Sequence, residues 1–151
     1  MDIYDKADYD GQQKAVEQLK KIFSGATLTI EQHFDDKANI DLYVTATTEN
    51  TTSTYAIECK DRQYTHTYSN EWFIEYPKYK RLMASKDDGY KPIYLNTFKD
   101  DYIAIWNVNV SKPVWEEKEL RKTTVEDTGV KKKLVGKLQL KDSVYQGKFK
   151  S

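Results

Sequence analysis

The chain has 151 residues, enough for one domain with its own hydrophobic core. Hydrophobic residues make up 38% and aromatic residues 13%, which excludes a disordered chain. The 24 basic and 24 acidic residues balance, so no net charge draws the whole molecule to nucleic acid. Without a membrane-length apolar run or a signal peptide, and with the single cysteine Cys59, the sequence predicts a cytoplasmic protein that binds no membrane.

The first segment, residues 1–10, is acidic and predicts a loose lead-in. From there apolar residues recur at spacings of three and four, which predicts an amphipathic helix with Asp10 as its N-cap and Gly25 just after its end. Glu17 lies beside the apolar stripe and is the only acidic residue of this helix. It either pairs with neighbouring lysines in solvent or belongs to a functional site.

A strand over residues 27–34 precedes a hairpin, residues 38–62, in which apolar and polar residues alternate strictly on both sides of a polar turn. The register that matches the apolar faces pairs Ile40 with Cys59, Leu42 with Ile57 and Val44 with Tyr55. The same register places Asp41 opposite Glu58. Lys60 then lies beside Glu58 on the same, polar face.

Two carboxylates directly opposed across a sheet repel each other, so fold stability alone does not select them. A divalent cation does, because Mg²⁺ takes oxygen ligands and binds through one or two carboxylates. An aspartate on one strand and Glu-x-Lys on the next, here Asp41 with Glu58 and Lys60, resembles the restriction endonuclease-like and Holliday junction resolvase-like PD-(D/E)XK nuclease superfamily. Ile40 stands where that pattern often has proline. The competing interpretation is a solvent-facing polar row.

The resemblance implies a Mg²⁺- or Mn²⁺-dependent nuclease that hydrolyses phosphodiester bonds in DNA. Asp41, Glu58 and the backbone carbonyl of Cys59 would bind the metal. Lys60 would orient water or stabilise the transition state, and Glu17 would complete an outer shell or a second metal position. Loss of Glu58 or Lys60 is then expected to abolish cleavage and leave the fold intact, since both lie on the polar face.

The segment after the hairpin, residues 63–70, is polar and predicts a loop. Its aromatic residues, Tyr64, His66 and Tyr68, either stack on a nucleic-acid strand or, more ordinarily, pack within the loop. Residues 71–76 are expected to be extended, because the proline that follows them fits only the first turn of a helix.

A second helix is predicted over residues 77–86. The resemblance implies that a basic residue of this helix lies near the scissile phosphate, and the sequence does not choose between Lys78, Lys80 and Arg81. Strands at 91–98 and 102–110 complete an α/β (α+β) fold. Its central mixed β-sheet is flanked by helices, in the order αβββαββ over residues 11–110.

The sequence predicts a single domain that spans 1–151, with residues 112–151 as a basic extension. The extension carries a net charge of +5, whereas residues 1–111 carry −5. Residues 116–120 predict a short turn or helix, and 130–135 and 137–140 alternate in part and predict short strands. The extension contains three consecutive lysines, Lys131, Lys132 and Lys133. Such a run is usually solvated, but these lysines are also candidates for contact with a nucleic-acid backbone.

Two other functions compete with the nuclease. One is a catalytically inactive nuclease-like module that binds nucleic acid or a protein, and the other is a structural protein whose polar row is incidental. Opposed carboxylates count against the inactive module, because a domain without catalysis has no chemical reason to keep them. A homodimer would allow both strands of DNA to be cut, but the sequence shows no interface.

Overall fold

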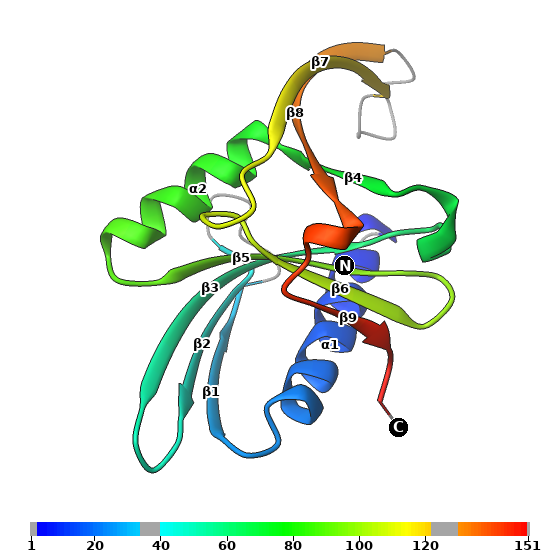
Figure 1. Ribbon diagram of the computed structural model, residues 1–151. Helices are drawn as coiled ribbons and strands as arrows, with labels where there is room; N and C mark the ends of the chain where they lie inside the picture. The colour runs from blue at the N-terminus through cyan, green and yellow to red at the C-terminus, as the bar shows by residue number, and fades with distance from the viewer. Residues whose placement is uncertain (1–2, 34–39, 122–129, 151) are drawn as a thin grey trace.

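The computed structural model describes residues 3–33, 40–121 and 130–150, without the side chains of 3–8, 120–121 and 130–131. The described part has an α+β fold, with one six-stranded and one three-stranded sheet (Figure 1). The helices are α1 (Ile3–Ile22) and α2 (Tyr76–Asp87), with 3-10 turns η1 (His66–Tyr68) and η2 (Leu140–Asp142). The strands are β1 (Thr27–Gln32), β2 (Leu42–Thr47), β3 (Thr52–Asp61), β4 (Glu71–Glu75), β5 (Lys91–Thr97), β6 (Tyr102–Asn107), β7 (Val114–Arg121), β8 (Val130–Gln139) and β9 (Tyr145–Lys148). Neither described helix is long and apolar enough to cross a membrane.

The large sheet has the strand order β1-β2-β3-β5-β6-β9. β3 and β5 are parallel, and the other neighbouring strands are antiparallel. The chain passes from β3 to β5 through β4 and α2, as a parallel pair requires a long connection. The register predicted for the central hairpin is confirmed for Leu42 with Ile57 and Val44 with Tyr55. The ladder begins at Leu42, so the predicted pairs of Ile40 with Cys59 and of Asp41 with Glu58 are not part of it.

Both faces of the large sheet are buried. On one face, Ala15 and Leu19 of α1 pack with Leu42 and Ile57. On the other face, α2 and the small sheet β4-β8-β7 form a second cluster with the large sheet, which includes Leu82, Trp72, Leu138, Tyr94 and Trp106. Each strand at the centre therefore contributes alternate residues to two different cores.

This double burial corrects two expectations. Glu58 does not lie on a solvent-facing polar face, because it points into the α2 side of the sheet and is only 1% exposed. A change at Glu58 therefore acts on folding as well as on any site. Ile40 belongs to the cluster on the α2 side and not to that of Leu42, because the chain bends at Asp41 before β2 begins.

The N-terminal segment is also corrected: α1 begins at Ile3, and Asp10 lies inside the helix rather than at its N-cap. Gly11 is inside it as well, and a Cβ at that position would lie only 2.9 Å from the Cβ of Asp61. The glycine thus allows α1 to approach the end of β3 closely, a long-range contact that a helix-cap pattern does not reveal.

The second helical region agrees with the sequence. Residues 71–75 are extended as β4, and α2 begins at Tyr76 with Pro77 in its first turn. In the C-terminal part, the turn or helix expected over 116–120 is wrong. That segment is strand β7, which pairs with β8 from Val114 to Arg121. Pairing has overridden the helix-favouring run of charged residues.

The two strands expected near the C-terminus form one ten-residue strand, β8, which with β7 makes a hairpin that curves away from the large sheet (Figure 1). β8 also pairs with β4, and β9 pairs with β6, so the basic extension contributes to both sheets. Gly136 of β8 lies close to Pro113, which precedes β7, and to Trp115 of β7. A Cβ there would overlap that of Pro113 and lie 3.0 Å from two ring atoms of Trp115.

This packing predicts that Gly136→Ala destabilises the protein by about 1–3 kcal/mol, the range for overpacking a tight contact. Gly25→Ala is the matched control, because a Cβ at Gly25 meets nothing within 4 Å. Urea denaturation of the three proteins measures the effect. Equal midpoints for Gly136→Ala and the wild type would contradict the close packing of β8 on Trp115.

Candidate functional site

The candidate site is built where β2 begins beside the end of β3. Asp41 precedes β2, and its backbone oxygen accepts a hydrogen bond of 2.8 Å from the amide of His33, which fixes its position at the end of β1. Its side-chain Oδ2 accepts a 2.9 Å hydrogen bond from the backbone amide of Cys59. Since Cys59 follows Glu58, the carboxylate of Asp41 lies against β3 beside the carboxyl group of Glu58, as the hairpin register predicted.

Glu58 has a strongly altered acidity. Burial raises its pKa, the charge of Asp41 and a hydrogen bond with Asp41 raise it further, and Lys78 and Arg81 oppose the shift; the resulting pKa is about 8. Near neutral pH the carboxyl group of Glu58 therefore keeps its proton, which it shares with Asp41 through their hydrogen bond, when no cation is bound. This is the behaviour of two acids placed too close for both to ionise freely.

Cations from α2 face this pair. Arg81 donates a 3.2 Å hydrogen bond from Nε to Oε1 of Glu58. Burial acts to lower the pKa of Lys78, but the charges of Tyr94, Glu58 and Asp41, followed by that of Glu75, outweigh it and raise the pKa. Of the three basic residues considered on this helix, the structure brings Lys78 and Arg81 to the carboxylates.

The third, Lys80, is exposed, and its Nζ lies 5.5 Å from the centre of the Tyr76 ring. Lys60 is also exposed and lies at the rim of the site near Glu75. Burial acts to raise the pKa of Glu75, but the hydrogen bond and charge of Lys133, with the charges of Lys78 and Lys60, lower it. A second acid with its own cations thus borders the carboxylate pair.

The structure does not bring every other candidate from the sequence to the carboxylates. Glu17 is exposed on α1, which covers the opposite face of the large sheet from α2, so the structure does not bring it to Asp41 and Glu58. Lys132 is exposed, and the side chain of Lys131 lies outside the described residues. Of the two lysines of this run whose side chains the structure describes, Lys133 lies beside the site, through its 2.9 Å ion pair with Glu75.

Sequence reasoning missed two residues that support the site. Arg62 donates hydrogen bonds to Oδ1 of Asn96 at 2.7 Å, to the backbone oxygen of Phe73 at 2.6 Å and to the hydroxyl of Tyr94 at 3.2 Å. Tyr94 pairs with Glu58 in the parallel register and donates to Phe73 O at 2.9 Å. Arg62 follows Lys60 at the two-residue spacing of one strand face, which was a usable signal. Tyr94 had none, because its position depends on β3 pairing with β5.

The donor set at this point suits a hard divalent cation. Asp41 and Glu58 supply carboxylate oxygens. The backbone carbonyl of Cys59 points to the same side of β3 as its backbone amide, which donates to Asp41. Across the described ranges, no three His, Cys, Asp or Glu side chains gather into a larger metal-binding cluster. A carboxylate pair with one backbone oxygen is the smaller kind of set that Mg²⁺ uses together with water and substrate phosphate.

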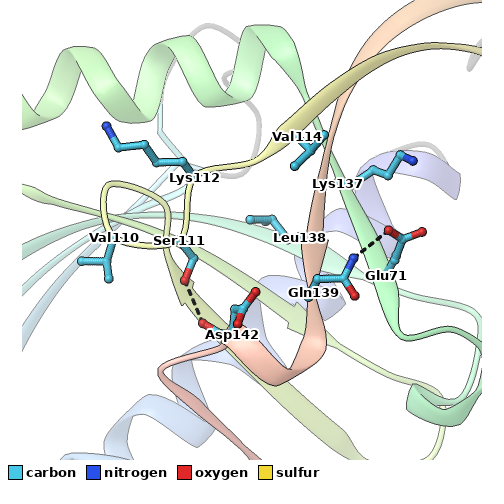
Figure 2. Close-up of a pocket in the computed structure, with 9 residues that line it drawn as sticks. All are labelled: Glu71, Val110, Ser111, Lys112, Val114, Lys137, Leu138, Gln139 and Asp142. Carbon is cyan, nitrogen blue, oxygen red and sulfur yellow. Dashed lines mark hydrogen bonds between the residues drawn. The ribbon is translucent and has the colours of Figure 1, made fainter.

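A surface cleft of about 390 Å³ lies apart from these carboxylates. Its walls come from the loop after β6, the starts of β4 and β7, the end of β8 and η2. Figure 2 shows its two polar links, Gln139 to Glu71 and Ser111 to the backbone of Asp142. Both links are hydrogen bonds within the protein.

Comparisons of the chain with known protein families, with characterised proteins and with solved structures find no match. The chemistry of Asp41, Glu58 and the cations around them therefore carries the functional assignment.

The raised pKa of Glu58 predicts how stability depends on pH without divalent cations. The folded state keeps the proton up to about pH 8, whereas the unfolded state releases it near the ordinary value of 4.5. Stability from this group is thus full below pH 4.5 and is lost as the pH rises toward 8. We expect the unfolding free energy of the wild type to fall relative to Glu58→Gln by up to roughly 1.4 kcal/mol per pH unit in that window.

Urea denaturation in EDTA at pH 5, 6.5 and 8 measures this difference. Glu49→Gln, at an exposed turn position, is the matched control and is expected to show no such trend. A constant difference between the wild type and Glu58→Gln across the window would refute the shared proton.

Proposed function

We propose that the protein is a divalent-metal-dependent nuclease that hydrolyses phosphodiester bonds in DNA. The observation that carries the proposal is the contact between Asp41 and the buried Glu58, whose pKa is raised to about 8. Two carboxyl groups in contact at a buried position beside Lys and Arg side chains destabilise the fold, but they are suitable ligands for a metal ion. Cytoplasmic location and action on DNA belong to this proposal.

Asp41, Glu58 and the Cys59 carbonyl would hold Mg²⁺ or Mn²⁺. When bound, the metal would supply Lewis acidity and lower the pKa of a water molecule. Lys78 lies on the carboxylate side of α2, where it is placed to stabilise negative charge developing on a phosphate. Lys60, at the rim, is placed to orient the attacking water or the phosphate that enters.

The arrangement of elements supports the resemblance to PD-(D/E)XK nucleases. A helix, three antiparallel strands and a second helix follow one another along the chain, with β4 inserted before α2, and β5 then pairs in parallel with β3. Glu58 lies on β3, and Asp41 is the residue directly before β2. Glu17 does not support it, and it has no role in the proposed site.

One observation favours the second candidate, a nuclease-like module that binds nucleic acid or a protein without cutting. Arg81 already pairs with Glu58, and the Cys59 amide already binds Asp41, so the pair is satisfied in part without a metal. An inactive module predicts that neither carboxylate binds a cation. The two candidates therefore differ in their response to metal.

The first test is a calorimetric titration of Mn²⁺ into the wild type and into the double variant Asp41→Asn/Glu58→Gln, whose side chains keep their size. We expect binding by the wild type only. Because Mn²⁺ must displace the proton shared by the pair, we also expect proton release, seen as a binding heat that differs between Tris and PIPES buffers at pH 7.

Equal binding by both proteins would place the cation elsewhere. A wild type that gives no heat, either alone or with a short DNA oligonucleotide present, would favour the inactive module. The double variant's far-ultraviolet circular dichroism confirms that loss of binding is not loss of fold.

The second test separates the lysines of α2. We expect Lys78→Met to lower kcat for Mn²⁺-dependent DNA cleavage by roughly 100-fold or more, the loss for one group that stabilises a transition state. Lys86→Met, at the other end of the same helix and exposed, controls for loss of charge. Cleavage is followed with fluorophore-labelled single-stranded, flap, junction and duplex DNA. Equal losses in both variants would assign the effect to general charge rather than to Lys78.

A further inference from the structure

The loop that follows β3 exposes two tyrosines. The side chains of Tyr64 and Tyr68 are 50% and 69% exposed, the highest values among the described tyrosines. Their rings stack on each other with centroids 4.4 Å apart and planes at 23°. Packing within the loop thus covers one face of each ring. Much of each tyrosine stays exposed to solvent.

The loop that presents them is firmly held. The His66 amide donates to Oδ1 of Asp100 at 3.1 Å, and its Nδ1 contacts Oδ2 of Asp100 at 2.6 Å. The His66 ring also stacks on Tyr102, with centroids 3.6 Å apart. The backbone oxygen of Tyr64 accepts a 3.0 Å hydrogen bond from the amide of Lys99. The tyrosines therefore sit on a segment anchored to the turn between β5 and β6, so a ligand would meet a preformed surface.

The chemistry of this surface selects its partner. Flat aromatic rings stack with nucleobases regardless of sequence, and each such contact with single-stranded nucleic acid is worth about 1–3 kcal/mol. Lys99 is exposed at the same turn, and Lys148 of β9 is exposed and donates to the backbone oxygen of Asp100 there. The acidic residues of the turn, Asp100 and Asp101, offset their charge. Stacking, rather than phosphate attraction, must then dominate binding. In a duplex the base faces are already stacked on each other, so an intact duplex offers these rings little.

The two tyrosines follow the carboxylate site closely along the chain. Tyr64 follows Lys60 by four residues, a span of at most about 14 Å for an extended chain. We propose that Tyr64 and Tyr68 form a stacking platform for the unpaired bases of a single-stranded DNA segment that leads to Asp41 and Glu58. The choice of DNA as partner rests on the nuclease proposed above. The substrate is then single-stranded DNA, or duplex DNA with a single-stranded end.

Fluorescence anisotropy in EDTA tests the platform without cleavage or metal. The probes are fluorescein-labelled oligothymidylate and a blunt duplex of the same length. We expect the wild type to prefer the single strand, and Tyr68→Ala to weaken that binding by roughly 5- to 150-fold. Tyr68→Phe keeps the ring and is expected to bind as the wild type does. Tyr9→Ala, on α1 and 37% exposed, is the matched control. Thermal melts of all variants check their folding.

The outcomes separate this inference from the proposed function. Single-strand binding that is unchanged in Tyr68→Ala, or an equal affinity of the wild type for the duplex, overturns the platform even if Mn²⁺-dependent cleavage is found. Single-strand binding lost in Tyr68→Ala and kept in Tyr68→Phe establishes the platform even if no cleavage is found. A further mark of stacking is a shallow salt dependence, because few phosphate charges are neutralised.

Discussion

The burial of one carboxyl group, that of Glu58, is the constraint around which the structure is arranged. A carboxylate removed from water is costly unless it is protonated, paired or bound to a metal. Glu58 uses the first two of these means: it shares a proton with Asp41 and accepts a hydrogen bond from Arg81. The elements that carry these partners, the start of β2 and the middle of α2, are therefore fixed in position by the same group that they stabilise.

The parallel pairing of β3 and β5 explains why the cations come from α2. A parallel pair cannot be joined by a tight turn, and here the connection runs through β4 and α2 across one face of the sheet. This connection places Lys78 and Arg81 above the face of the sheet to which the Glu58 side chain points. It also places Tyr94 beside Glu58, where its hydroxyl links the backbone of β4 to Arg62. The catalytic proposal thus depends on topology as much as on the residues of the hairpin.

Local patterns gave the sequence analysis its correct results. Strict alternation fixed the register of β2 and β3, and Pro77 located the start of α2, because both signals act over a few residues. The burial of Glu58 was missed because it depends on α2 packing over β3 and β5, a contact between segments distant in the chain. The place of Glu17 was missed for a related reason: helical spacing shows which residues share a stripe, but not which face of a sheet the helix covers.

The same long-range packing shapes the chemistry open to the carboxylate pair. In a solvent-facing row, Asp41 and Glu58 would both ionise near pH 7 and each would be hydrated. Against α2, the pair retains a proton that a divalent cation can displace, because the cation neutralises both carboxylates whereas the proton neutralises one. Arg81 donates its hydrogen bond to Oε1 of Glu58. Proton, arginine and the proposed cation would therefore compete for one buried group, and a bound cation would offset the cost that burying Glu58 imposes on the fold.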